Sequence, residues 1–316
     1  MPAYICYLLP ISNQLLNTSI TSLQFAFLHI GCKLEDLQQP LPSVMEFNSW
    51  NIVWCLCFGL LATLIVVGNL LTIWIFLKQR LRKRAHFLLI SLAVADLLVG
   101  LITVPLYIAI NTVSHFGQPY LLGYLSELTD IFTSIASIFA LAAISLERMC
   151  AIGWPFRHRT LTFRVYIFPI AIPWILSAIF TSIALLTYFS IITWKNFVYI
   201  RTLFLSTPLL VMCIAYYIIW KKQKPMIGNQ NHVIRETRLA KTLFIITAAS
   251  LLTWLPFQIL ILLLRFGVIL NLPYLNATVF LIKVLQFSNS LVNVIIYPLR
   301  ISEFKTALLQ MFRCRA

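Results

Sequence analysis

The chain has 316 residues, of which 60% are hydrophobic and only 10% are charged, against roughly 25% charged residues in a soluble domain. This composition excludes an ordinary water-soluble globular protein. The formal net charge is +15, which we interpret as anchoring to anionic lipid at the cytoplasmic surface of a membrane and not as nucleic-acid binding.

Seven apolar segments are long enough to cross a bilayer, whose hydrocarbon core needs about 20 residues of helix. Backbone amides in lipid must be satisfied within one segment, and these segments do not alternate as barrel strands do, so we expect helices. In chain order they cover residues 51–77, 86–110, 121–147, 166–190, 198–220, 239–264 and 276–299. The predicted fold class is an all-α membrane protein with a seven-transmembrane helix bundle.

The bundle divides the chain into three parts. We expect an extracellular tail over residues 1–48, the transmembrane domain over 49–301, and a cytoplasmic helix and tail over 302–316. The last part carries large apolar side chains at helical spacing, at Phe304, Leu308, Met311 and Phe312. That spacing is typical of an amphipathic helix lying on the membrane.

The cations indicate the orientation. Most of the 24 Lys and Arg residues follow the first, third, fifth and seventh segments, and positive loops stay cytoplasmic. We therefore expect a multi-pass plasma-membrane protein with an extracellular N-terminus and a cytoplasmic C-terminus. Asn17 and Asn276 begin glycosylation sequons on the outer side, and Cys314 is a candidate for palmitoylation at the inner leaflet.

The third segment carries Asp130 near one end and Glu147-Arg148 at the other, with no charge between them. Roughly 27 Å of helix separates Asp130 from Arg148, close to the thickness of the hydrocarbon core. Intramembrane acids are costly and are usually functional. One charge is thus expected beside an outer pocket and the other at the cytoplasmic face.

Further motifs stand in a fixed order around this helix. They are Asn69 in GNLL, Asp96 in LAVADLL, Trp174, Pro208, Tyr216, Trp254 and Pro256 in TWLPF, and Asn293 and Tyr297 in NSLVNVIIY. With Glu147-Arg148-Met149, this order resembles the class A, rhodopsin-like G-protein-coupled receptors over residues 51–316. The resemblance implies a receptor that is not an enzyme, needs no cofactor, and has a small-molecule agonist, a heterotrimeric G protein and arrestin as partners.

The resemblance also identifies a ligand pocket, closest to that of biogenic-amine receptors. Asp130 stands where those receptors keep the aspartate that pairs with a protonated ligand nitrogen, and Glu127 lies on nearly the same face. With Lys283 the two acids leave a charge of −1, which suits a cation or a zwitterion. An internal salt bridge from Lys283 to Asp130 or Glu127 is the open alternative. The rest of the predicted lining is Ser134, Trp254, Phe257, Gln258 and Phe287.

A second site is expected deep in the bundle, where an isolated charge at Asp96 would be expensive. The resemblance implies an allosteric sodium ion with hard oxygen ligands. A water-bridged polar network without an ion is the alternative. The other residues of this predicted site are Ser137, Asn289, Ser290 and Asn293.

At the cytoplasmic end the resemblance predicts that Arg148 pairs with the preceding glutamate and with Glu236 at the foot of the sixth helix. An agonist would favour an outward-swung sixth helix, and Arg148 would then meet Tyr216 and Tyr297. Phe156 is predicted to contact the G protein, with a lipid-facing aromatic as the alternative.

Several positions depart from the family pattern. Val294 replaces the proline of the Asn-Pro-x-x-Tyr motif, so the seventh helix loses one cause of a kink. Ser250 stands where an aromatic usually packs beneath the tryptophan, and Thr253 replaces a cysteine. Gly123 occupies the position of the cysteine that bonds the second extracellular loop. We therefore expect a looser outer lid and altered activation.

Other functions are disfavoured. Opsins carry a retinal-binding lysine six residues before the motif asparagine, and that position here is Phe287, whereas Lys283 lies ten residues before Asn293. An intramembrane hydrolase needs bases or metal ligands at depth, but the five histidines fall in the tail, in loops or at a helix edge. A transporter would show repeated halves. A nucleoside, melatonin-like, peptide or lipid ligand is the remaining alternative to an amine.

Overall fold

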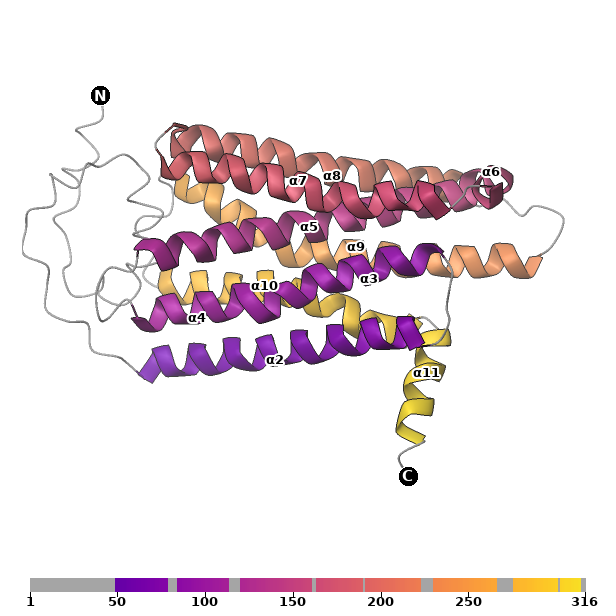
Figure 1. Ribbon diagram of the computed structural model, residues 1–316, viewed down its shortest axis with the longest axis horizontal. Coiled ribbons are helices and arrows are strands. Elements are labelled where there is room, and N and C mark those ends of the chain that lie inside the picture. The colour runs from indigo at the N-terminus through magenta and orange to yellow at the C-terminus, as the bar shows by residue number, and fades with distance from the viewer. Residues whose placement is uncertain are drawn as a thin grey trace, which may run out of the picture.

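The computed structural model describes residues 49–78, 84–113, 120–160, 163–189, 191–222, 230–265, 275–300 and 302–313. Its elements are α2 (Ser49–Lys78), α3 (Arg84–Leu98), the π-helix η3 (Val99–Thr103), α4 (Val104–Val113), α5 (Tyr120–Gly153), α6 (Pro155–Thr160), α7 (Phe163–Tyr188), α8 (Trp194–Lys222), α9 (Gln230–Arg265), α10 (Leu275–Arg300) and α11 (Ser302–Arg313). The long helices run side by side along one axis, and α11 turns away from the bundle at one end (Figure 1).

The predicted spans are confirmed as helices. Six helices of the described chain are long and apolar enough to cross a membrane, and a shorter apolar stretch, Thr247–Leu263, lies in α9. The seven-helix architecture predicted from the sequence is therefore correct. Most helices extend beyond the expected apolar segment by a few residues, because hydropathy marks the part in lipid whereas the backbone hydrogen bonds continue into the polar boundary.

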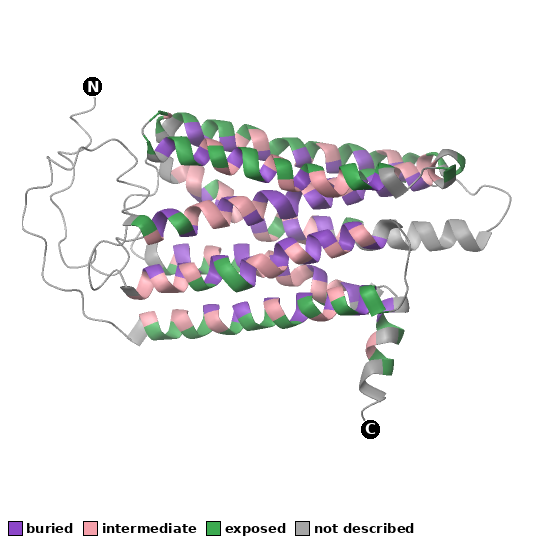
Figure 2. Cartoon of the chain, viewed as in Figure 1, coloured by how far each residue is buried: buried purple, intermediate pink, exposed green. Residues whose placement is uncertain are grey.

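Helix α5 is the centre of the bundle. It packs against α3, α4, α7, α8 and α9, and 67% of its most apolar window is buried, against 28% in α7 and 33% in α2. Figure 2 shows the same contrast between the inner helices and the outer ones. The charges of Asp130, Glu147 and Arg148 are thus carried by the helix that has the most neighbours.

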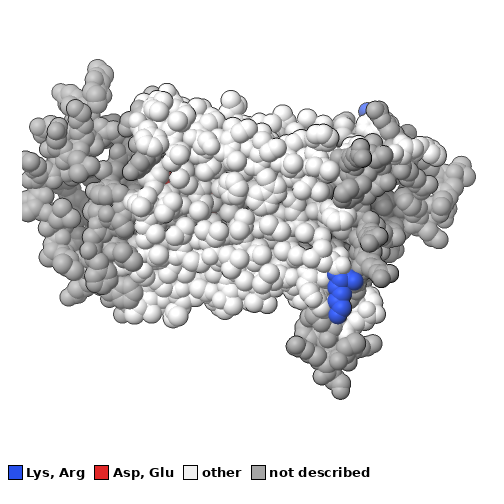
Figure 3. Space-filling view, in the orientation of Figure 1, with Lys and Arg blue, Asp and Glu red and all other residues white. Residues whose placement is uncertain are grey.

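The outer surface of the bundle suits lipid. Large apolar side chains are exposed on it, among them Leu56, Phe168, Leu203 and Leu299. Exposing such side chains costs little free energy only where lipid hydrocarbon surrounds them. On the face in Figure 3, blue Lys and Arg side chains of the described chain stand out only at the end that carries α11. Between the two ends this face is uncharged.

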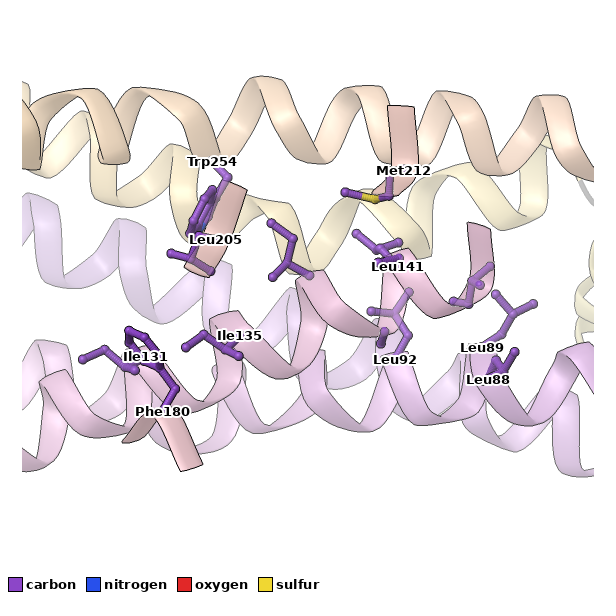
Figure 4. Close-up of a cluster of buried hydrophobic side chains, with 14 of the residues drawn as sticks. Leu88, Leu89, Leu92, Ile131, Ile135, Leu141, Phe180, Leu205, Met212 and Trp254 are labelled. Carbon is purple, nitrogen blue, oxygen red and sulfur yellow. The ribbon is translucent and has the colours of Figure 1, made fainter. Parts of the chain in front are cut away.

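A cluster of buried side chains fills the bundle around α5. Figure 4 shows it running along the helices, with Ile131 and Trp254 toward one end and Leu88 and Leu89 toward the other. The Trp174 indole also crosses between helices, because its Nε1 donates to Ser91 Oγ at 2.9 Å. These contacts fix the α5 face that carries the functional side chains.

The second span is not one continuous α-helix as expected. Residues Val99–Thr103 form a π-helical turn, closed by the Val104 N–H donating to the Val99 carbonyl. A Cβ atom at Gly100 would lie 2.9 Å from Val66 Cγ2 and 3.1 Å from the Ala62 carbonyl oxygen, so α2 approaches this turn closely. A π-turn inserts an extra residue and rotates all that follows. Hydropathy carries no signal for such a turn.

Val294 fills the position of the missing proline by packing against α2. A Cβ atom at Gly68 would lie only 2.5 Å from Val294 Cγ1. Helix α10 continues without interruption through this point, from Leu275 to Arg300. The glycine therefore makes room for the branched valine side chain.

Candidate functional site

An ion pair joins α5 and α10 in the part of the bundle that is predicted to face outward. Lys283 Nζ on α10 donates to Asp130 Oδ2 on α5 at 2.8 Å, and both side chains are only about one-seventh exposed, at 13% and 14%. Gln286 Nε2 donates to Asp130 Oδ1 at 3.0 Å, and Ser134 Oγ donates to the same oxygen at 3.3 Å. Of the two acids left open by the sequence, Asp130 is the one that binds Lys283.

Aromatic rings surround the lysine of this pair. Its Nζ lies 4.0 Å from the ring centroid of Phe257, 5.3 Å from that of Phe287 and 5.6 Å from that of Tyr107. Cation–π attraction holds an ammonium group in such a place. The predicted Phe257 and Phe287 are thus brought to the site, and Tyr107 arrives there from the segment after the π-turn.

Two side chains of the site, Gln286 and Arg201, were not predicted from the sequence. Gln286 follows Lys283 by one helical turn, and this spacing could have identified it. Arg201 on α8 is 7% exposed, and its guanidinium carbon lies 5.4 Å from the Phe257 ring centroid. It interacts electrostatically with Asp130 and Glu127. With Arg201 included, the two acids are balanced by two cations.

A small cavity extends inward from the ion pair. It has a volume of about 20 Å³, room for a water molecule or two. Its walls run from Asp130, Ser134, Trp254, Gln286 and Phe287 to Ser137, Asn289 and Ser290. Residues of the predicted ligand pocket and three residues of the predicted sodium site, Ser137, Asn289 and Ser290, therefore line the same cavity, whereas Asp96 and Asn293 are not part of its lining.

Gln258 does not join the hydrogen-bond network around Asp130. Its Nε2 atom is buried and has no hydrogen-bond partner among the described residues. Ser250 Oγ, at the position that usually carries an aromatic, is also buried without a partner there, and it lines the cavity. The small side chain of Ser250 thus leaves open space beneath Trp254.

Asp96 accepts hydrogen bonds from two distant helices. Ser137 Oγ on α5 donates at 3.1 Å, and Asn293 Nδ2 on α10 donates at 2.7 Å; Ser290 is a third hydrogen-bonding side chain at this carboxyl group. Asn289 is engaged elsewhere, because its Oδ1 accepts from Thr253 Oγ1 at 3.2 Å. The network therefore joins α3, α5 and α10, whereas Asn289 joins α10 to α9.

The oxygen atoms around Asp96 fit the coordination of a small hard cation. Asp96 and Ser137 offer oxygen ligands, and the Asn293 Oδ1 atom is buried with no partner in the described part of the chain. An oxygen atom without a hydrogen-bond partner, next to a buried carboxylate, is a suitable ligand for a cation or a suitable acceptor for a water molecule.

Glu147 is the hub of a polar network at the end of the bundle that is predicted to be cytoplasmic. Arg148 Nη2 donates to Glu147 Oε1 at 2.6 Å, so the expected pair of neighbours is present. His158 Nε2 on α6 lies 3.0 Å from the same oxygen, and the Tyr166 hydroxyl on α7 lies 2.6 Å from that nitrogen. Both members of the pair are nearly inaccessible, at 8% and 4% exposure.

The two tyrosines predicted to take part in activation occupy different surroundings. The Tyr216 hydroxyl accepts from Ser145 Oγ at 3.1 Å and lies 3.1 Å from Thr247 Oγ1. Tyr297 is fully buried between the rings of Phe76 and Phe304, and its hydroxyl has no partner in the described chain. Tyr216 thus joins α5, α8 and α9 in this arrangement.

Four predicted positions lie partly or wholly beyond what the structure describes. Asn17 and Cys314 are outside the described residues, and so are the side chains of Glu236 and Asn276. Phe156 is described and is 79% exposed, as a contact residue for a partner or for lipid must be.

Comparison with known proteins points to one family. The family described as 7 transmembrane receptor (rhodopsin family) matches residues 68–297. The human histamine H2 receptor is 30% identical over 310 residues, covering 86% of this chain and 82% of the receptor. The galanin receptor 2a of Danio rerio is 27% identical, covering 84% and 79%. The adenosine receptor A3 of Canis lupus familiaris is 26% identical, covering 83% and 91%.

Proposed function

Because the chain belongs to the rhodopsin family of seven-transmembrane receptors, we propose that it binds a small extracellular ligand through an ammonium group and activates a heterotrimeric G protein. Members of this family are receptors and not enzymes. The observation that carries the proposal is the Asp130 carboxylate, held 2.8 Å from the ammonium of Lys283 in the outer part of the bundle. The site already binds one ammonium group.

The Lys283 ammonium is the competitor that a ligand must displace. A ligand ammonium that replaces it gains the same short, charge-assisted hydrogen bond to Asp130. The exchange leaves Asp130 paired, so it avoids the cost of a buried single carboxylate. It also releases the tie between α5 and α10 and disturbs Gln286, which donates to Asp130 as well.

The helix α5 connects this exchange to the cytoplasmic end. It is continuous from Tyr120 to Gly153 and carries Asp130 and Arg148. Ligand binding shifts the population toward an arrangement in which α9 swings outward and Arg148 leaves Glu147. Phe156, exposed on α6, then contacts the G protein or arrestin.

A sodium ion at Asp96 forms part of the proposal. The ion would take its oxygen ligands from Asp96, Ser137, Ser290 and the buried Oδ1 of Asn293, with Asn289 at the cavity wall. It would supply only charge and coordination. Because it would stabilise the compact arrangement of α3, α5 and α10, we expect sodium to lower agonist affinity.

The setting of the receptor completes the proposal. We propose a multi-pass plasma-membrane protein with Asn17 and Asn276 glycosylated outside and Cys314 palmitoylated inside, and with α11 lying on the inner leaflet. The apolar outer surface and the exposed Lys305 on α11 support it. A positive side chain beside an apolar helix face favours the anionic cytoplasmic leaflet.

A non-amine ligand is the second candidate, because Lys283 already satisfies Asp130. A nucleoside, melatonin-like, peptide or lipid ligand could then leave the ion pair intact. The relatives include an adenosine receptor and a galanin receptor, which supports this class of ligand. No described feature favours a transporter.

The two candidates are separated by the variant Asp130→Asn, tested in nanodiscs with purified G protein. Nucleotide exchange is measured against histamine, tyramine and tryptamine. We expect the half-maximal concentration of an active amine to rise by about 100-fold, since the charge-assisted bond is lost. Ser182→Ala is the control, because Ser182 is exposed on α7 and donates only to its own helix at Ala178. An unchanged amine response in Asp130→Asn contradicts the amine proposal.

A further inference from the structure

Arg201 is a buried cation with no hydrogen-bonded anion among the described residues. Its side chain comes from α8 and is 7% exposed. Among the described residues no oxygen accepts a hydrogen bond from its guanidinium, and no carboxylate lies within ion-pairing distance. Its described close contact is the Phe257 ring, 5.4 Å away. A guanidinium removed from water is expensive to keep when it only interacts with acids at a distance and forms no direct ion pair with them.

Arg201 changes the charge balance of the outer pocket. Asp130 and Glu127 are opposed by Lys283 and Arg201, so the four described groups sum to zero. A ligand with only an ammonium group would make this poorly hydrated pocket positive. A ligand with one ammonium and one carboxylate would leave it neutral and would pair both of its own charges.

We propose that the ligand of this receptor is an amino-acid-like zwitterion, whose ammonium group binds Asp130 and whose carboxylate binds Arg201. This inference rests on the proposed function and narrows its ligand class. It concerns a residue on α8 that the amine site on α5 and α10 does not include.

The geometry around Phe257 supports a short ligand. Lys283 Nζ lies 4.0 Å and the Arg201 guanidinium carbon 5.4 Å from the centroid of the same ring. The two cations are therefore no further apart than the sum of these distances. An ammonium at Asp130, in place of Lys283, is thus within a small molecule's length of Arg201. The displaced Lys283 keeps Glu127 as an acid with which it already interacts electrostatically.

The side-chain chemistry of arginine fits a carboxylate. Its planar guanidinium presents parallel N–H donors that match the two oxygens of a carboxylate. A lysine at the same place would keep the charge but would lose this paired geometry. The variant Arg201→Lys therefore separates charge from geometry.

The test uses matched pairs of probes on the full-length receptor in nanodiscs with purified G protein. The pairs are histidine and histamine, tyrosine and tyramine, and tryptophan and tryptamine, which differ only in the carboxylate. We expect at least one amino acid to stimulate nucleotide exchange at a lower concentration than its amine. Arg201→Gln should weaken that amino acid by about 10- to 100-fold and leave the amine within a few-fold. Arg201→Lys should give an intermediate loss.

Two results overturn the inference. The first is that, in all three pairs, the amine stimulates nucleotide exchange at the same concentration as its amino acid or at a lower one. The second is that none of the three amino acids stimulates exchange. In the first case an amine response that still depends on Asp130 leaves the receptor proposal standing. If Arg201→Gln does not reach the membrane, the test relies on Arg201→Lys and on the three ligand pairs measured with the wild-type receptor.

Discussion

The two charged regions of α5 are built differently. At the outer end, Asp130 meets Lys283 from a helix 153 positions away in the chain. At the end predicted to be cytoplasmic, Glu147 and Arg148 are neighbours in sequence, and His158 and Tyr166 join them from α6 and α7. The outer pair thus holds two helices together and can be replaced by a ligand, whereas the inner pair joins two neighbouring residues of one helix.

This difference shows which region can act as a switch for a ligand. Breaking the outer pair leaves the Asp130 carboxylate with the neutral donors Gln286 and Ser134, so an incoming ammonium can take the place of the lysine. Breaking the inner pair leaves Glu147 with His158 at 3.0 Å, so the acid keeps a partner. The outer region is therefore suited to sensing and the inner region to retaining a resting arrangement.

The largest effect is expected at the outer pair. Lys283→Met leaves Asp130 buried without its cation, so stability should fall by about 3 kcal/mol. The double variant Lys283→Met/Asp130→Leu removes both charges and should recover most of that loss. Thermal unfolding in detergent, followed by loss of native fluorescence, measures both. Equal melting temperatures for Lys283→Met and the wild type would show that the pair is not a structural tie.

A substitution outside both charged regions shows how much stability is lost through packing alone, without any change of charge. Gly68→Ala places a methyl group against the stiff Val294 side chain, where a Cβ atom would be 2.5 Å from Cγ1. We expect a loss of about 2 kcal/mol from overpacking. Val294→Ala should rescue Gly68→Ala in the double variant. If Val294→Ala does not rescue Gly68→Ala, the two residues are not in the contact that the structure describes.

At the inner pair the expected stability change is smaller. Arg148→Met should cost about 1.5 kcal/mol, because Glu147 retains His158 and Tyr166 as partners. Nucleotide exchange should fall steeply while ligand binding stays near the wild-type value. A parallel loss of binding and exchange would mean that Arg148 acts through folding and not through coupling.

The smallest effect is expected at His158. His158→Ala removes one of the partners of Glu147 and should lower stability by about 1 kcal/mol. Because α6 is then held less firmly to α5, basal nucleotide exchange should rise. The readout is exchange without added ligand, with Thr202→Ala as control, since that hydroxyl donates within its own helix to Val198. Unchanged basal exchange would limit His158 to a structural role.

Much of the site was predictable because the family motifs fix positions along helices. Asp130, Asp96 and the Glu147-Arg148 pair were identified from the sequence, and the structure places their partners Lys283, Ser137 and Asn293 within hydrogen-bond distance. The choice of Asp130 over Glu127 as the partner of Lys283 was not predictable. Both acids lie on nearly the same face, and only the rotation of α10 relative to α5 selects one of them.

The sequence by itself determined that the chain crosses a membrane as seven helices, because apolar length and unsatisfied backbone groups allow little else in lipid. It also determined which helices carry charge. Only the tertiary structure decided that Arg201 faces the same ring as Lys283, that Glu147 binds His158, and that a π-turn redirects Tyr107. Those outcomes depend on how helices are rotated against one another, and helix rotation is set by packing contacts between residues far apart in the chain.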